Sequence, residues 1–332
     1  MEEDLQEQAC WLLLVFESGL STRVVNNIVV AWCHQHKHSM QEFYAADARE
    51  WIDVCSLSAD VTKKLEQSRE KLVGQAFLVE QLAHNQIHML TVLNTNYPKL
   101  LKTSLKREKT PPVLFYAGNL RILERKTIAV IGSRSAGEES LEFTRAISAC
   151  LAEQGANVIS GNARGVDRAA YEGATSTDGC TTVVLPHGIR KLSGVQLRAL
   201  QPKIESGNVL LMSQFHPDAQ WVVSRAMERN KVVTGLAQVV IVAESNIQGG
   251  TWEGANGALK QHRPLYVRQA ASTLPGNNKL IELGGHALPW PVEDVATMLS
   301  PILKESAELQ QEKQEAVNHP DQLSLFATSS GD

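Results

Sequence analysis

Residues 159–174 read ISGNARGVDRAAYEGA, and this stretch decides which class of fold the chain can adopt. It opens at the end of an apolar run, passes through a turn that holds Gly161, Arg164 and Gly165, and continues into an alanine-rich segment of helical length. Apolar runs of this kind are typical of buried strands, and glycine is typical of sharp turns. The stretch therefore predicts a strand, a flexible and positively charged turn, and a helix.

The same rhythm repeats on both sides of this stretch. Six short apolar runs alternate with segments of helical length, at residues 127–133, 157–161, 181–188, 208–214, 239–245 and 264–268. Near-continuous apolar character is typical of strands buried on both faces, and strands that alternate with helices form parallel sheets. We therefore predict an α/β fold built on a doubly wound, mostly parallel sheet.

The chain divides into segments around this main domain. We expect a small helical domain over residues 1–69, a connecting region with short strands over 70–124, the α/β domain over 125–300, and a polar tail, helical or loose, over 301–332. In the first segment, Ser21 or Thr22 is placed to cap a helix.

Composition limits the compartment and the class of function. The chain has 332 residues, 43% of them hydrophobic, and its net charge of −4 excludes a uniformly basic coat for nucleic acid. Five scattered cysteines are typical of free thiols in a reducing compartment. The apolar run at residues 11–16 is too short to cross a bilayer. We expect a cytoplasmic protein with no membrane partner.

Small and positively charged residues gather where the predicted strands end. Ligands of doubly wound sheets bind beyond the carboxyl ends of the strands, where glycines and helix N-termini favour anions. These residues are Gly132, Ser133 and Arg134 after the first run, Ser160, Gly161, Arg164 and Gly165 after the second, and Gly250 and Thr251 after the fifth. One such turn is an ordinary connection, but three at one sheet edge predict a phosphate site.

The turns lack the motifs of two common classes of phosphate site, the dinucleotide-binding fingerprint and the P-loop. Residues 132–137 have no central glycine of the dinucleotide fingerprint, and Glu138 and Glu139 stand where a P-loop needs lysine and a hydroxyl. Arg134 and Arg164 instead supply planar guanidinium groups that suit phosphate oxygens. We expect no cofactor.

Two further groups of residues are less specific. Arg229, Asn230 and Lys231 precede an apolar helical stretch, and they can form a second basic contact or a solvated helix face. The histidines of CHQHKH, residues 33–38, would fan apart on a helix, so we expect no metal site.

The combination of these motifs resembles the DNA-processing protein A family, also called DprA or Smf. The resemblance rests on IAVIGSR at 128–134 and SGNARGVD at 160–167, and it extends to PPVLFYAGNL at 111–120 and to SGLSTR at 18–23, which is similar to the family's small helical domain of the SAM or helix-hairpin kind. The family implies a Rossmann-like domain that binds single-stranded DNA along a basic cleft and hands it to the recombinase RecA. It also favours a homodimer.

The resemblance carries roles onto particular residues of this chain. It implies DNA-backbone contacts at Ser133, Arg134, Ser160, Gly161, Arg164, Arg229 and Asn230. The same turns add Gly132, Gly165, Lys231, Gly250 and Thr251 to the expected phosphate-binding set. Asp167 is expected to cap or brace its turn rather than to touch a phosphate.

The chain also departs from the family pattern. Tyr171 stands where a histidine is usual, Gly249-Gly250 where a Ser-Gly pair is expected, and Arg268-Gln269 where the family has Pro-Gly. We interpret these changes as those of a divergent member.

The polar tail contains a second motif. The sequence QLSLF, formed by Gln322, Leu323, Ser324, Leu325 and Phe326, matches the pentapeptide with which bacterial replication and repair proteins bind the β sliding clamp. In that interaction the glutamine can hydrogen-bond at a pocket edge while the last two side chains enter an apolar pocket. The alternative is that these apolar residues dock on the chain's own surface.

An enzyme remains a competing hypothesis. QGGTWEGA, residues 248–255, resembles a shortened form of the signature of lysine-decarboxylase-like (LOG) hydrolases, which cleave the N-glycosidic bond of nucleotides. In that case Glu253 would be the catalytic carboxylate, and Arg134 or Arg164 would anchor the phosphate. A module that senses a nucleotide without turnover is a third hypothesis.

Overall fold

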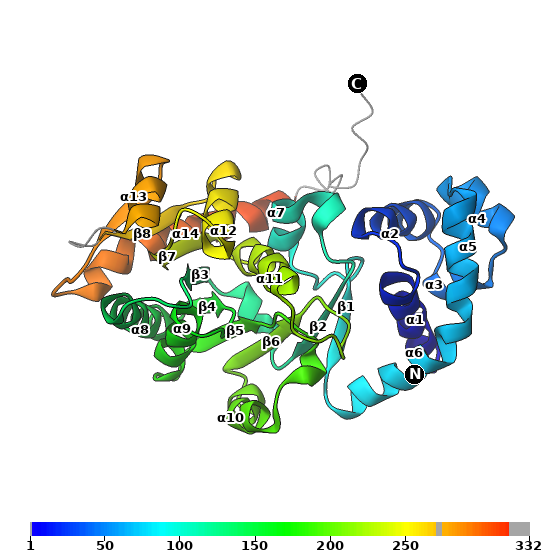
Figure 1. Cartoon of the computed structure of the whole chain (residues 1–332), viewed down its shortest axis with the longest axis horizontal. Helices are drawn as coiled ribbons and strands as arrows, with labels where there is room; N and C mark the ends of the chain where they lie inside the picture. The colour runs from blue at the N-terminus through cyan, green and yellow to red at the C-terminus, as the bar shows by residue number, and fades with distance from the viewer. Residues whose placement is uncertain (1, 270–273, 319–332) are drawn as a thin grey trace. The chain divides into compact units, whose positions relative to one another are not determined.

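The computed structural model describes residues 2–269 and 274–318, which form two compact units (Figure 1). The first unit extends to Tyr116, and the second begins at Ala117. Each unit buries a set of apolar side chains of its own.

The first unit is mainly helical. Its helical segments are α1 (Glu2–Leu12), η1 (Leu13–Glu17), α2 (Thr22–Ile28), η2 (Val29–Gln35), α3 (Met40–Ala45), α4 (Ala48–Cys55), α5 (Ala59–Ser68), η3 (Arg69–Lys71), α6 (Leu72–His84) and α7 (Lys99–Lys109). Of the two expected caps, Ser21 is the one that accepts a hydrogen bond at the start of α2, from the backbone N–H of Val24. Trp32, Phe43 and Trp51 are buried together as an aromatic core.

A pair of antiparallel strands ends the first unit. β1 (His88–Thr91) pairs with β2 (Val113–Ala117), so that Met89 lies opposite Phe115. Between them the buried Tyr97 donates a hydrogen bond of 2.7 Å to the carbonyl of Pro111. The short strands expected in this region are therefore present.

The second unit is an α/β domain with seven parallel strands. They are β3 (Thr127–Gly132), β4 (Asn157–Ser160), β5 (Cys180–Val184), β6 (Val209–Ser213), β7 (Val239–Glu244), β8 (Leu265–Gln269) and β9 (His286–Pro289). Within this unit their order is β6-β5-β4-β3-β7-β8-β9, and all neighbours run parallel. The predicted doubly wound sheet is confirmed, and the six predicted strands are β3 to β8.

The strand β9 is not predicted by the apolar runs. Only Leu288 among its four residues is buried, and the strand ends in a proline. A short edge strand of this kind carries no hydrophobic period that a sequence pattern can detect.

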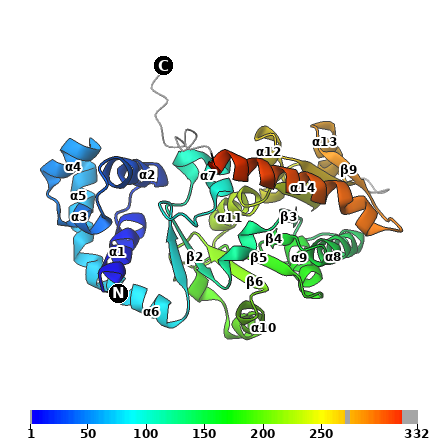
Figure 2. The same cartoon turned by 180° about the vertical axis from the view of Figure 1, so that it is seen from behind.

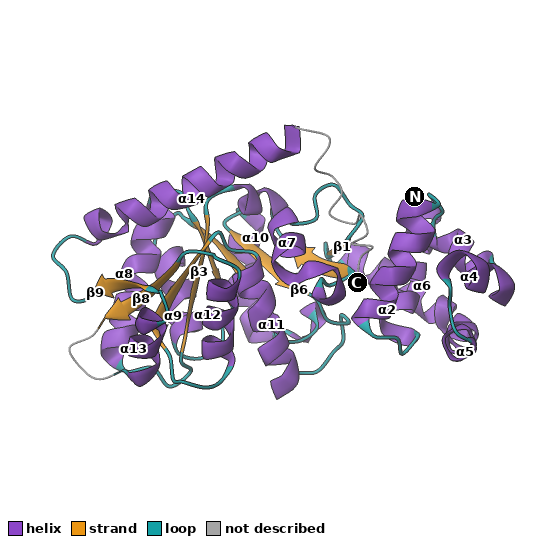
Figure 3. Cartoon of the chain, turned by 90° about the horizontal axis from the view of Figure 1, so that it is seen from above, coloured by secondary structure: helices purple, strands orange, loops and turns teal. Residues whose placement is uncertain are grey.

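Helices cover both faces of this sheet. They are α8 (Glu138–Glu153), α9 (Val166–Thr175), α10 (Gly194–Glu205), α11 (Val223–Gly235), α12 (Gly250–Lys260), α13 (Pro275–Glu282) and α14 (Val295–Asn318), with the 3₁₀ turns η4 (Leu120–Glu124) and η5 (Ile189–Lys191). Val130 of β3 belongs to the core under α8, α9 and α14, whereas the next residue, Ile131, faces Gly254 of α12. Figure 3 accordingly shows α14 and α12 on opposite sides of the strands.

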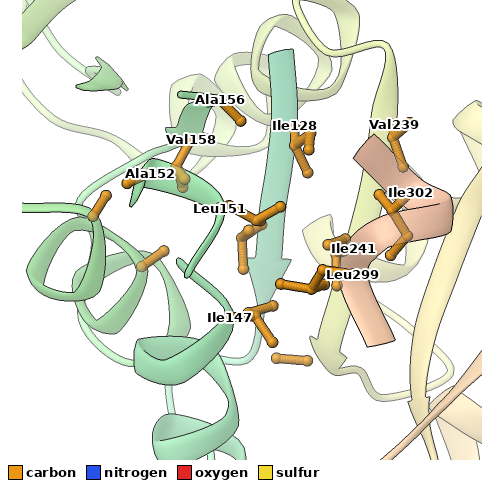
Figure 4. Packing of buried hydrophobic residues seen from close by; sticks show 14 of the residues in the cluster. Ile128, Ile147, Leu151, Ala152, Ala156, Val158, Val239, Ile241, Leu299 and Ile302 are labelled. Carbon is orange, nitrogen blue, oxygen red and sulfur yellow. The ribbon is translucent and has the colours of Figure 1, made fainter. Parts of the chain in front are cut away.

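The main core lies between the sheet and one of these helical layers. Ile147 and Leu151 of α8, Ile128 of β3, Ile241 of β7 and Ile302 of α14 are all fully buried in one cluster (Figure 4). The cluster joins the start, the middle and the end of the α/β unit, so burial of apolar surface is the term that holds this unit together.

The strand order reverses around β3, which places the candidate site. From β3 the chain moves outward through β4, β5 and β6 on one side, and it then crosses to β7 on the other. Ligands of open α/β sheets bind beyond the carboxyl ends of the strands at such a switch point. The turns that follow β3, β4 and β7 are therefore at the expected position.

The polar sequence after Pro301 begins as packed helix. Ile302 and Ser306 of α14 are fully buried, and Tyr266 donates a hydrogen bond of 2.8 Å to Glu305. Figure 2 shows α14 as a long helix that lies along the α/β unit. The expected clamp motif at residues 322–326 lies outside the described residues. In the part of the chain that the structure describes, no helix combines the length and the apolar character that crossing a membrane requires.

The core makes a quantitative prediction. Leu151→Ala removes a fully buried side chain from the main cluster, and we expect the free energy of unfolding to fall by about 2–5 kcal/mol. Leu197→Ala makes the same chemical change on α10, where the leucine is 45% exposed, and should change stability by less than about 0.5 kcal/mol. Urea denaturation of both variants is the measurement, and equal losses would contradict this placement of the core.

Candidate phosphate-binding site

Three turns meet at the switch point of the sheet. The backbone N–H of Ser133, just after β3, donates a hydrogen bond of 2.9 Å to the carbonyl of Glu244 at the end of β7. The N–H of Val166, at the start of α9, donates one of 3.2 Å to the carbonyl of Ser133. The turns expected to form a phosphate cradle are therefore bonded directly to one another.

The glycines of these turns allow the backbones to pack against each other. A Cβ on Gly132 would overlap the side chain of Val166, and one on Gly165 would overlap the carbonyl of Ser133. Gly165 also has a φ of +83°, which a residue with a side chain adopts only with strain. Close packing of the loops is therefore one physical reason for these two glycines.

Arg229 lies inside the protein, unlike the exposed arginine that the sequence led us to expect. Its side chain is 1% exposed, and its Nη1 donates a hydrogen bond of 2.9 Å to the carbonyl of Val184. The guanidinium fills the space that a Cβ on Gly161 would need. Arg229 therefore supports the floor of the site from inside the protein.

The charge of Arg229 is balanced by Asp167. Nη2 of the arginine lies 3.4 Å from Oδ2 of the aspartate, whose side chain is largely buried near the start of α9. Burial raises the pKa of Asp167, and the positive charge of Arg229 opposes that rise. Ser160 is also fully buried, so it too lies under the surface that a ligand would meet.

Arg134 and Arg164 are the exposed cations of the site. Both line a groove of about 520 Å³ beyond the ends of β4 and β5, and neither an aspartate nor a glutamate is among its twelve lining residues. Apolar side chains of Leu185, Pro186 and Trp221 complete part of its wall. The groove is positively charged and partly apolar, which suits a ligand that carries both phosphate and flat rings.

A much smaller hollow adjoins these turns. It has a volume of about 30 Å³, and Asn230, Gly250 and Thr251 line it together with Arg134 and the Arg229–Asp167 pair. This space matches a single water molecule rather than a nucleotide. Lys231 is exposed and lines neither this hollow nor the groove.

A second buried arginine supports the turn after β3 that carries Arg134. The sequence does not identify this arginine as part of the site. Arg268 at the end of β8 is 1% exposed, and its Nη2 donates a hydrogen bond of 2.7 Å to the Ser140 hydroxyl. That hydroxyl donates one of 2.6 Å to Glu244, which also accepts the N–H of Gly137. The loop that carries Arg134 is thus tied to β7 and β8.

The carboxylate required by the enzyme hypothesis lies elsewhere. Glu253 is exposed on the first turn of α12, and it does not line the hollow or the groove. In the described part of the chain, no group of three or more histidine, cysteine, aspartate or glutamate residues could hold a metal ion.

Comparison with known proteins identifies the family of the chain. The family model for DNA recombination-mediator protein A matches residues 88–300. Protein Smf of Escherichia coli is 27% identical over 228 residues, which are 68% of this chain and 59% of Smf. DNA processing protein DprA of Streptococcus pneumoniae is 30% identical over 157 residues, which are 47% of this chain and 55% of DprA. The chain spans less than two thirds of the length of either relative.

Two solved structures match the fold. The crystal structure of DprA from Streptococcus pneumoniae has a TM-score of 0.63 at 22% identity and covers 88% of this chain and 96% of its own. DNA processing protein A from Helicobacter pylori, which is described in terms of its single-stranded DNA binding mode, has a TM-score of 0.56 at 26% identity and covers 66% and 97%.

The fold is a Rossmann-like α/β domain of the kind seen in the DprA structure from Streptococcus pneumoniae. The chain belongs to the DNA recombination-mediator protein A family, whose members are named DprA and Smf. The resemblance seen in the sequence motifs is therefore confirmed.

The two kinds of arginine should respond differently to substitution. Arg229→Met leaves Asp167 without its buried partner, and we expect the free energy of unfolding to fall by about 3 kcal/mol. Arg134→Met removes an exposed charge and should change stability by less than about 0.5 kcal/mol. Chemical denaturation checks both variants. Equal stability of the two would show that Arg229 is not a buried brace.

Proposed function

We propose that this chain binds single-stranded DNA along the groove that Arg134 and Arg164 line, without reading its sequence. The observation that supports this most directly is a groove with two exposed arginines and no acidic residue in its wall. The single-stranded DNA binding described for the Helicobacter pylori relative, which shares 26% identity, supports the same ligand.

The proposed binding depends on phosphate contacts at a rigid edge. Arg134 and Arg164 offer forked donors to the backbone oxygens, while Ser133 and the hollow at Asn230, Gly250 and Thr251 offer polar groups beside them. Contacts of this kind follow the backbone and are the same for every base sequence. Gly132, Ser160, Gly161, Gly165, Arg229 and Asp167 then serve to hold the turns in place.

A nucleotide hydrolase is the less favoured function. Its catalytic carboxylate would be Glu253, which lines neither the groove nor the hollow. The hollow of about 30 Å³ is too small for a nucleotide, whose sites occupy some hundreds of cubic ångströms. The groove of about 520 Å³ is large enough, but its wall has no carboxylate to act as the catalytic group.

The first experiment is a salt series with labelled oligo-dT of about 12 nucleotides. In fluorescence anisotropy, the double variant Arg134→Ala, Arg164→Ala should bind more weakly than the wild type at every salt concentration. Because each lost phosphate contact lowers the slope of log K against log salt by about 0.7, the slope should shrink by about 1.4.

The matched control removes two exposed charges away from the groove. Arg121→Ala, Lys304→Ala changes the net charge by the same amount, and neither residue lines the groove. It should leave affinity and slope close to wild type. Identical losses in the two double variants would mean that overall charge, and not the groove, binds DNA. Equal affinity for a mononucleotide and the oligonucleotide would favour a nucleotide pocket.

We also propose three protein partners: RecA, the β sliding clamp and a second copy of this chain. The description of the family as a recombination mediator supports delivery of the bound strand to a recombinase. The pentapeptide at residues 322–326 supports tethering to the clamp. Association of two copies rests on the family resemblance, and no residue is assigned to it or to RecA.

The partner proposals can be tested on the full chain. Deletion of residues 322–326 should abolish co-elution with the β clamp while single-stranded DNA binding stays unchanged, because the groove residues remain. Unchanged co-elution would contradict the proposal that this motif binds the clamp. Light scattering that reports one copy per particle would contradict the homodimer. RecA filament formation that the protein does not accelerate would contradict RecA as a partner.

A further inference from the structure

Trp221 is a large aromatic side chain left open to solvent at the groove. Its surface is 47% exposed, and it lies two residues before the start of α11. The next two residues, Val222 and Val223, are 40% and 62% exposed. Of these three residues only Trp221 lines the groove, so its indole is the one placed to contact a ligand there.

The surroundings of Trp221 specify the chemistry of that partner. The indole lies beside the Arg134 guanidinium, whose Cζ is 5.7 Å from the ring centroid. Leu185, Pro186 and Leu192 line the same groove. A flat ring, a cation and an apolar wall in one groove fit a group that has a flat ring of its own and an attached anion.

The groove also excludes some occupants by charge. Its lining residues include Arg134 and Arg164 and no aspartate or glutamate, so an acidic ligand is favoured over a basic one. Nearby, Asp218 lies 3.5 Å from Arg190 and 3.8 Å from Lys191, which balance its charge. A nucleotide unit combines the required negative charge with the required ring.

We propose that Trp221 is a stacking platform for one unpaired base of the bound strand, next to the phosphate that Arg134 holds. This inference rests on the proposed function. Phosphate contacts alone are made equally by single strands and duplexes, whereas a base can stack on a side chain only when it is free of its partner strand. Trp221 therefore supplies the preference for single-stranded DNA.

The test compares strands with and without bases. In fluorescence anisotropy with oligo-dT of about 12 nucleotides, Trp221→Ala should bind at least about fivefold more weakly, because stacking on an aromatic side chain contributes about 1–3 kcal/mol per base. Trp221→Phe keeps a ring and should retain most of the affinity. Val223→Ala, on a residue that is exposed but does not line the groove, should bind like wild type.

A strand of the same length made of abasic sugar phosphates isolates the base. Wild type should bind this strand about as weakly as Trp221→Ala binds oligo-dT, and Trp221→Ala should lose little further affinity on it. Trp221→Ala should also narrow the gap between single strand and duplex. These three results together establish contact with the base.

The other outcomes separate the inference from the function on which it rests. If Trp221→Ala binds oligo-dT as tightly as the wild type does, the stacking platform is overturned but the proposed function is not. An equal loss on normal and abasic strands shows that Trp221 acts only through Arg134, and it also overturns base contact. No binding by the wild type overturns the proposed function itself. Binding of a free mononucleotide as tightly as the strand makes a nucleotide, not DNA, the occupant.

Discussion

The buried ion pair between Arg229 and Asp167 is the interaction on which the candidate site depends. A permanent positive charge inside a protein requires a partner, and here the carboxylate of Asp167 and the carbonyl of Val184 provide it. Three elements supply these groups, because Arg229 belongs to α11, Asp167 to α9 and Val184 to β5. The pairing therefore fixes the first turn of α9 and the course of α11 together, and a glycine at 161 leaves room for it.

This arrangement divides the arginines of the strand ends into two groups. Arg229 and Arg268 are each 1% exposed and lie near carboxylates, whereas Arg134 and Arg164 reach the groove. The buried pair holds the loops, and under the proposed function the exposed pair meets the ligand. Because the loops are already fixed by backbone hydrogen bonds, binding costs mainly the ordering of two side chains. A flexible loop with the same charges would lose more entropy on binding.

The sequence predicts most of the sheet and where the turns of the candidate site lie, but not the burial of Arg229 and Arg268. Apolar runs suffice for β3 to β8, since each is buried on both faces, whereas β9 shows no such run. A sequence gives the charge of a residue but not its burial, so Arg229 is predicted from the sequence to be a surface cation. A signal was nevertheless present. Ala226, Val232 and Val233 are buried and stand three or four residues from Arg229, which places the arginine on the inner face of its helix.

The departure at Arg268 from the family pattern has a structural counterpart in the second brace. At that position the chain places a guanidinium that bonds the carbonyl of Ala243 and the hydroxyl of Ser140, and that lies 3.3 Å from Glu139. These groups surround the start of α8, directly after the turn that carries Arg134. Arg268 thus supports the turn from behind, while Arg134 and Arg164 reach the groove in front. A turn needs rigid support but not any particular donor of that support, so a buried arginine can serve as the brace at this position.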